Sequence, residues 1–260
     1  MRLTKRTHLV GSEQFGLSHP LDCNCYLIDC GSELALVDCG LGLGAEEVLS
    51  NITQSGFNIE KLAHVLVTHS HIGHWGGSEA IRKRTKACIW VSSLGASSMA
   101  NVDDDPGIRI NLKFRRYPSG FVPQSCVPDA TFSDGERIKI GDVELRMIQV
   151  QGHTKDSTCF LFEDDSTQCL FTGDTVFYAG KIGLLNLEGC SLEDYRRDIV
   201  KLADLNVDAL FPGHGVFVLN RGQKHIQRAI HKLSDFVLPE SFFEDNEFAW
   251  DRDYLKTLSG

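Results

Sequence analysis

The sequence lacks a long apolar run and has fewer basic residues, 26, than acidic ones, 35. None of its 260 residues falls in an apolar stretch of about 18 residues, which predicts no transmembrane helix. The charged N-terminus has no apolar centre, so we expect no signal peptide. The formal net charge of −9 argues against a broad nucleic-acid surface. We therefore expect a cytoplasmic protein with neither a membrane nor a nucleic acid as partner.

The chain also lacks the cysteine pattern of small disulfide-linked domains. Its nine cysteines are odd in number and contain no C-x-x-C pair, so we expect buried, reduced thiols. The hydrophobic fraction of 42% and the charged fraction of 23% are typical of a globular protein. A chain of this length buries about three quarters of its unfolded surface in one core.

Strand and helix patterns alternate along much of the chain, which favours a sheet with helices packed on it. The segment 25–40 predicts two strands joined at Gly31-Ser32. Ser191, followed by acidic residues, is a good N-cap for a helix. Further strands are expected over 63–68, 87–92, 136–140, 143–150, 158–164, 168–174 and 207–215, and helices over 45–56, 76–85, 191–206 and 221–238.

Two segments do not follow this alternation. Residues 95–128 are polar, contain proline and glycine and show no clear period, so we expect an irregular lid or pocket insertion. Residues 240–260 form an acidic tail with aromatic side chains, which predicts a tail docked on the domain.

Six residues with metal-binding side chains follow apolar strands at loop positions near glycines. They are His69, His71, His74, His153, Asp174 and His214. Since loops at one edge of a sheet converge, we expect these side chains to meet. Imidazole is a good ligand for zinc and iron, and three such ligands leave a coordination position for water. The sequence therefore predicts a metal centre.

Five motifs make the chain resemble the metallo-β-lactamase-fold superfamily. In order they are VDCG at 37–40, THSHIGHWGG at 68–77, GHT at 152–154, GDT at 173–175 and PGHG at 212–215. The resemblance covers about residues 20 to 230. It implies an α/β fold of the αββα sandwich type, with two mixed β-sheets face to face and helices outside, formed by a single domain over 1–260.

The resemblance also implies roles for the six residues. One metal site would consist of His69, His71 and His153, and a second of His74 and His214, with Asp174 shared between them. Asp38 is either a turn residue or a carboxylate that orients ligands. The expected ion is zinc, one or two per chain, with iron or manganese as alternatives.

One position departs from the family pattern H-x-H-x-D-H, because Gly73 stands where relatives have aspartate. That aspartate binds the second metal and helps to orient the attacking water. Without it, Asp174 is the only carboxylate that opposes the charge of two dications. We expect the second site to bind weakly or to stay empty.

The leading functional hypothesis is hydrolysis of a small ester, thioester, lactone or amide by metal-bound hydroxide. Asp174 would act as general base. A second hypothesis is persulfide oxidation at a single iron held by His69, His153 and Asp174, and a third is a binding protein without catalysis. The expected partner is a small-molecule substrate, and a homo-oligomer is possible.

The segment after Asp174 offers a further catalytic candidate. Tyr178 or Lys181 could lie beside the metal and polarise a carbonyl group. Alternatively, Tyr178 packs at the edge of the sandwich. The sequence leaves this choice open.

Overall fold

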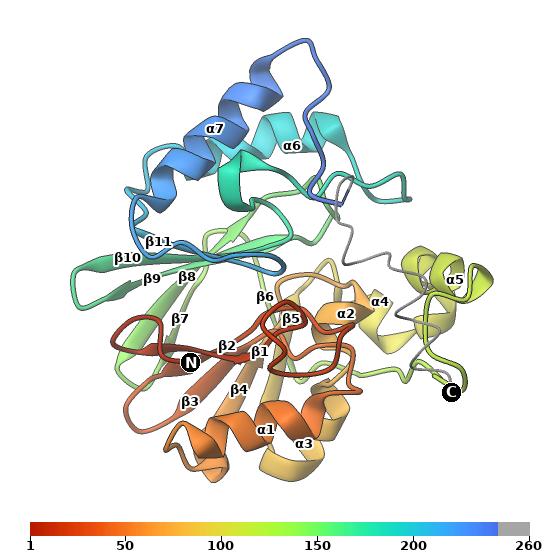
Figure 1. Cartoon of the computed structure of the whole chain (residues 1–260), viewed down its shortest axis with the longest axis vertical. Helices are drawn as coiled ribbons and strands as arrows, with labels where there is room; N and C mark the ends of the chain where they lie inside the picture. The colour runs from red at the N-terminus through yellow and green to blue at the C-terminus, as the bar shows by residue number, and fades with distance from the viewer. Residues whose placement is uncertain (244–260) are drawn as a thin grey trace.

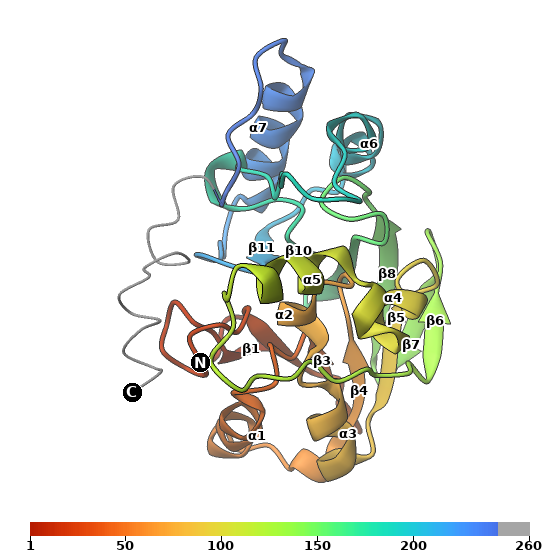
Figure 2. The same ribbon diagram turned by 90° about the vertical axis from the view of Figure 1, so that its right-hand side faces the viewer.

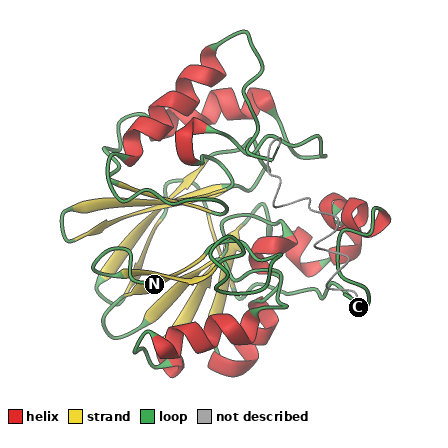
Figure 3. Cartoon of the chain, viewed as in Figure 1, coloured by secondary structure: helices red, strands yellow, loops and turns green. Residues whose placement is uncertain are grey.

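Two β-sheets pack face to face, and helices cover their outer faces (Figures 1 and 3). The structure is a computed structural model and describes residues 1–243. The first sheet has the strand order β1-β2-β3-β4-β5-β6, and the second has the order β11-β10-β9-β8-β7. Each sheet contains parallel and antiparallel pairs. This is the predicted αββα sandwich.

The strands are short, and most lie where the sequence predicts them. The first sheet consists of β1 (Thr7–Gly11), β2 (Cys25–Asp29), β3 (Leu34–Val37), β4 (Leu62–Leu66), β5 (Cys88–Ser92) and β6 (Ala130–Phe132). The second consists of β7 (Arg137–Ile140), β8 (Val143–Gln149), β9 (Thr158–Asp164), β10 (Thr167–Gly173) and β11 (Ala209–Pro212). The sequence analysis did not identify β1 and β6.

The helices fall into three groups (Figures 1 and 2). The first sheet is covered by α1 (Ala45–Gln54) and α3 (Ser78–Thr85), and the second by α6 (Leu192–Asp198) and α7 (Gly222–Ser234). Between these layers, at one edge, lie α2 (Ile72–Trp75), α4 (Ala96–Ala100) and α5 (Pro106–Lys113). The remaining turns are 3-10 helices at Ile59–Lys61, Val102–Asp104, Tyr178–Gly180 and Ile199–Leu202. Within residues 1–243, no helix is long and apolar enough to cross a membrane.

Three buried apolar clusters fill the spaces between the four layers. In β2, Tyr26 and Ile28 belong to the cluster between the sheets, whereas Leu27 belongs to the cluster beneath α1 and α3. This alternation follows from the period of two in a strand, which directs successive side chains to opposite faces. Between the sheets, the Phe171 ring packs 5.4 Å from that of Tyr26 and 5.1 Å from that of Phe211. Both sheets are therefore buried on both faces.

The segment 95–128 is more ordered than its composition predicts. It contains α4 and α5, so the expectation of an irregular segment was wrong. The start of α5 has a clear local cause, since Pro106 occupies the first turn and the Asp105 side chain accepts a hydrogen bond from Ile108 N. Residues 240–243 contact the domain, with Phe242 stacked on Phe177 at 4.1 Å. The rest of the tail, 244–260, lies outside the described residues.

Asn24 joins the first sheet to the loop that follows β11. It is 1% exposed and lies directly before β2. Its side-chain Nδ2 donates to the carbonyl oxygens of Pro212 and Gly215 at 3.0 Å each, and its main-chain N–H donates to Gly213 O at 2.6 Å. These bonds fix a loop that carries one of the predicted metal ligands. A buried amide with these partners is costly to remove, because the carbonyl groups would lose their donors.

We expect Asn24→Ala to lower the free energy of unfolding by about 1 to 3 kcal/mol. Urea unfolding followed by circular dichroism measures this change. The matched control is Asn101→Ala, which removes an exposed amide whose partner is the nearby Ser97 carbonyl. An Asn24 variant as stable as the Asn101 variant would contradict the proposed bridging role.

Candidate metal centre

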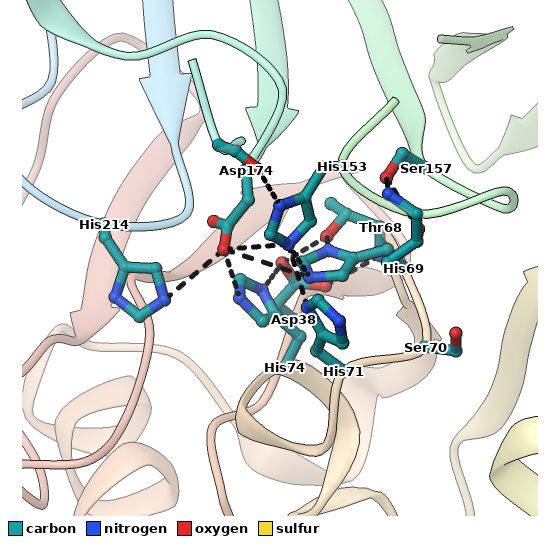
Figure 4. A network of polar contacts seen from close by, with 12 residues as sticks. Asp38, Thr68, His69, Ser70, His71, His74, His153, Ser157, Asp174 and His214 are labelled. Atoms are coloured by element: carbon teal, nitrogen blue, oxygen red, sulfur yellow. Dashed lines mark hydrogen bonds and ion pairs between the residues drawn. The ribbon is translucent and has the colours of Figure 1, made fainter. Parts of the chain in front are cut away.

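All six predicted metal-binding residues meet at one edge of the sandwich (Figure 4). They come from the segment after β4 including α2, the loop after β8, the end of β10 and the loop after β11. Four are buried, and His71 and His214 are partly buried. The structure thus brings together residues that are up to 145 positions apart, counted from His69 to His214. Their role as ligands remains a prediction.

The first group consists of His69, His71 and His153. His153 Nε2 lies 3.2 Å from His69 Nε2 and 2.8 Å from His71 Nδ1. Asp174 Oδ2 lies 3.4 Å from His153 Nε2 and 3.9 Å from His69 Nε2. The three nitrogens and this oxygen therefore surround one small volume, as ligands of a single ion do.

The second group consists of His74 and His214 on the other side of the same carboxylate. Asp174 Oδ2 lies 3.5 Å from His74 Nε2 and 3.8 Å from His214 Nε2. The rings of the two histidines lie edge to face, with centroids 5.2 Å apart. One carboxylate oxygen is thus within reach of both histidine groups, which is the arrangement of a bridging ligand.

Neutral hydrogen-bond partners fix the tautomers of two histidines in the first group. His153 Nδ1 donates to the carbonyl oxygen of Gly183 at 2.5 Å, which leaves a lone pair on Nε2. Thr68 Oγ1 donates to Asp38 Oδ2 at 2.8 Å and therefore accepts from His69 Nδ1 at 3.0 Å. His69 consequently also has its lone pair on Nε2.

Carboxylates hold the second group in the same way. His74 Nδ1 donates to Asp38 Oδ2 at 2.8 Å, and His214 Nδ1 donates to Glu13 Oε1 at 3.1 Å. Each Nε2 atom therefore lies on the side of Asp174 and carries a lone pair when its ring is neutral. Burial disfavours the charged rings, but nearby acidic groups including Asp174 raise the pKa of His74 well above its usual value and also raise the pKa of His214, so that a metal ion would displace a proton from each ring. Asp38 also accepts from Thr68 N and has a φ of 56°, so it is a turn residue whose carboxylate also fixes the orientation of the His74 ring.

These atoms fit a divalent metal ion. The lone pairs of His153 Nε2 and His69 Nε2 face each other across 3.2 Å, an arrangement that is repulsive unless a cation lies near both. Burial lowers the pKa of both histidines, which disfavours their protonation. Asp174 Oδ1 is buried without a hydrogen-bond partner among the described residues. Neutral imidazoles and a buried carboxylate are the ligands that zinc and related ions prefer.

Asp174 remains ionised although it is buried. Burial alone would raise its pKa, but the charges on His74 and His214 hold the pKa of Asp174 well below its usual value. Tyr195 fixes the backbone at this point, because its hydroxyl donates to Asp174 O at 3.1 Å and accepts from Gly183 N at 3.2 Å. The sequence analysis missed Tyr195, which lies within the helix α6 and shows no motif.

A second buried carboxyl group, also missed from the sequence, links the ligand loops. Asp156 Oδ1 accepts from Ser70 Oγ at 3.0 Å, and Ser70 lies between His69 and His71. Asp156 Oδ2 has no hydrogen-bond partner in the described part of the chain. Its signal in the sequence is a carboxylate three residues after His153, within a loop rich in hydroxyl groups.

The metal centre lies at the base of a cavity of about 770 Å³. His71, His74, His153, Asp174 and His214 all line it. The same cavity is lined by residues between 105 and 117 and between 184 and 187, together with Ser241 and Phe243. The segment predicted to be a lid or pocket insertion therefore supplies one wall, whereas its closing motion remains a prediction.

Gly73 also lines this cavity, as the second residue of α2. A Cβ atom built on it would meet no atom within 4 Å. Its backbone is not in the left-handed region, so nothing in the local conformation requires glycine. The position could hold a larger side chain in the cavity that His74 and Asp174 also line.

Tyr178 lies apart from the metal centre, so the structure does not support its proposed catalytic role. Its side chain is 54% exposed, and its ring packs 4.9 Å from that of His225 on α7. Neither Tyr178 nor Lys181 lines the cavity. The physical reason is a turn at Tyr178–Gly180, where Ala179 adopts a φ of 60° and the chain turns toward α7.

We expect His69→Ala, His71→Ala and His153→Ala each to remove most of the bound metal, since each leaves only two histidines in the first group. Elemental analysis of the purified variants measures this loss. His231→Ala, an exposed histidine on α7, is the control and should retain the metal content of the parent protein. Full metal content in any of the three variants would show that the ligand assignment is wrong.

Known proteins match this chain in sequence and in fold. A thioesterase from Aspergillus fumigatus, atrochrysone carboxyl ACP thioesterase, is 27% identical over 80% of this chain and 55% of its own length. A hydroxyacylglutathione hydrolase from Rhodospirillum rubrum is 32% identical over 60% of this chain and 48% of its own length. The chain thus spans about half the length of these curated relatives.

The solved structure of the metallo-beta-lactamase FEZ-1 from Legionella gormanii has the same fold. Its TM-score is 0.68 at 21% identity, and the match covers 90% of this chain and 93% of that one. The sequence model of the Metallo-beta-lactamase superfamily matches residues 19–214, which include all six metal-binding candidates. The chain therefore belongs to the metallo-beta-lactamase superfamily.

Proposed function

We propose that this protein is a metal-dependent hydrolase that cleaves thioesters. One observation carries the proposal: imidazole lone pairs converge on the buried carboxylate of Asp174 at the base of an open cavity. Two relatives support the choice of bond, because they are named a thioesterase and a hydroxyacylglutathione hydrolase. The first group of histidines with Asp174 would hold the principal metal ion.

A divalent ion bound there lowers the pKa of a water ligand to about 7 and polarises a substrate carbonyl. The protein supplies the remaining functions. Asp174 Oδ2 lies 3.4 Å from His153 Nε2 and 3.5 Å from His74 Nε2, so this carboxylate can orient the attacking water by accepting a hydrogen bond from it. His153 and His69 are held by Gly183 and Thr68, which keeps their Nε2 atoms directed at one point.

The chemistry of the leaving group favours a thioester over an amide. A thiol has a pKa of about 8.5, so it departs as a thiolate with little help from an acid. An amine must be protonated as it leaves, which requires a well-placed donor or a second metal. Gly73 removes one ligand from the second site, and His214 donates its Nδ1 proton to Glu13 rather than to a leaving group. A site with this composition is therefore better suited to a leaving group that needs no proton.

The iron-dependent alternative uses His69, His153 and Asp174 but leaves His71 without a role. His71 Nδ1 lies 2.8 Å from His153 Nε2, which places it within the same group of ligands. Three histidines favour zinc, whereas two histidines and one carboxylate favour a single iron. Metal analysis after aerobic purification distinguishes the two, and a protein that binds metal without turnover would be a binding member of the fold.

We expect the purified protein to hydrolyse acyl thioesters and to lose this activity when a chelator removes the metal. Release of thiol, followed with a chromogenic disulfide reagent, measures the reaction. Adding back zinc, manganese or iron(II) in turn should restore turnover and identify the ion that supports it. Thiol release that continues in the metal-free protein would contradict the proposed function.

We expect Gly73→Asp to raise the metal content from about one toward two ions per chain, because it adds a carboxylate beside His74 and Asp174. The open space around Gly73 admits the side chain without a clash. Elemental analysis and calorimetric titration with zinc measure stoichiometry and affinity. Asn186→Asp adds the same charge elsewhere on the cavity lining and should leave the stoichiometry unchanged. A parent protein that already binds two ions tightly would show that Gly73 does not limit the site.

A further inference from the structure

One wall of the cavity is apolar. It is formed by α5, by the residues that follow it and by the loop after Asp174. We define the apolar wall as Ile108, Ile110, Phe114, Tyr117, Leu185 and Leu187, all of which line the cavity. Five of these six side chains are partly or fully exposed, and only Ile108 is buried. Covering apolar surface of this kind with an apolar ligand is favourable, because it removes that surface from water.

One face of α5 is directed at the cavity. The lining residues Gly107, Ile110, Asn111 and Phe114 are spaced by three and four positions, which places them on one side of a helix. Leu112, on the same helix, does not line the cavity although it is 46% exposed. The helix therefore presents a specific face to the ligand space and a different face to solvent.

The apolar wall is close to the metal centre. A Cβ atom built on Gly107 would lie 3.6 Å from His71 Cδ2 and 3.5 Å from a methyl group of Leu187. These distances place the start of α5 directly beside the first group of histidines. A substrate whose carbonyl lies at the histidines would therefore have its adjoining group against the apolar wall.

The polar side chains on this side of the cavity are Asp105, Asn111, Arg116 and Asn186, together with the Tyr117 hydroxyl, and some of them are engaged within the wall. Asn111 forms a hydrogen bond with the Tyr117 side chain. Asp105 lines the cavity, but its Oδ1 accepts the hydrogen bond from Ile108 N at 2.7 Å that caps α5. Arg116 is the only lysine or arginine among the described lining residues, and its guanidinium lies 5.5 Å from the Phe114 ring. A strongly polar acyl group would leave its hydrogen-bonding groups without partners against such a wall.

We propose that the apolar wall binds the acyl group of the substrate, so that the enzyme prefers thioesters of extended apolar acids. This inference rests on the proposed thioester hydrolysis and specifies its substrate class. The acyl group is the part that fits, because carrier thiols such as coenzyme A and glutathione are polar and charged. We expect these polar carriers to remain in solvent at the open side of the cavity and not to contact the apolar wall.

Acyl thioesters of one small thiol, from acetyl through butyryl and hexanoyl to octanoyl, test the proposal. We expect kcat/KM to rise about three- to fourfold for each methylene group that the apolar wall covers. In Ile110→Ala and Phe114→Ala we expect kcat/KM for the octanoyl substrate to fall about tenfold, with the acetyl substrate unaffected. The matched control Leu112→Ala should behave like the parent protein throughout the series.

Two results in this series would overturn the proposal. One is a kcat/KM that does not depend on acyl length in the parent protein. The other is a rise with the length of an alkylthiol esterified to acetate, which would place the leaving group on the apolar wall. Circular dichroism of each variant confirms that it is folded.

Binding of the product acids separates this inference from the proposed function. Calorimetric titration of the metal-loaded protein with acetate and with octanoate compares ligands that share a carboxylate and differ only in the apolar chain. Tighter binding of octanoate, lost in Ile110→Ala and kept in Leu112→Ala, would support the acyl site even if no thioester were hydrolysed. Equal affinity for the two acids would overturn the acyl site whether or not thioesters were cleaved.

Discussion

The constraint on which this structure depends is the close approach of imidazole lone pairs in a buried space. His69 Nε2 and His153 Nε2 lie 3.2 Å apart, and each ring is fixed in the tautomer that directs a lone pair at the other. Without a cation this arrangement is unfavourable, since burial also disfavours protonation of either ring. The fold meets the constraint through loops at one edge of two sheets, which core packing holds rigid. Metal binding and folding of this edge are therefore energetically linked.

Much of the fold and of the ligand set could be predicted because the relevant signals are local. Short apolar runs bounded by turn residues mark the strands, and His153 and His214 each follow such a strand within a short glycine-containing motif. The partners that orient these side chains could not be predicted in the same way. Glu13 lies 201 positions from His214, and Gly183 lies 30 positions from His153. Their pairing is decided by how the sheets pack, which no local pattern encodes.

The wrong expectation for residues 95–128 and the position of Tyr178 away from the cavity have related physical causes. The segment 95–128 has a composition typical of loops, yet Asp105 and Pro106 form a helix start that outweighs the surrounding polar residues. Tyr178 follows Asp174 closely in sequence, but it belongs to the turn Tyr178–Gly180, which contacts α7. Tyr178 therefore does not line the cavity. The tyrosine that does contact Asp174 is Tyr195, placed there by packing of α6. Proximity in sequence is thus a poor guide to a site assembled from loops of two sheets.

The loss of a carboxylate at Gly73 is partly offset by the groups behind the second pair of histidines. His69 and His153 are held by a hydroxyl and a carbonyl, which are neutral, whereas Asp38 holds His74 and Glu13 holds His214. A carboxylate behind an imidazole makes it a more basic ligand and brings negative charge close to the ion. Because this charge acts through the ring rather than by direct coordination, it offsets only part of what an aspartate would supply. We therefore expect the first group of histidines to bind a metal ion more tightly than the second group. The second group should still bind a metal ion, but with lower affinity.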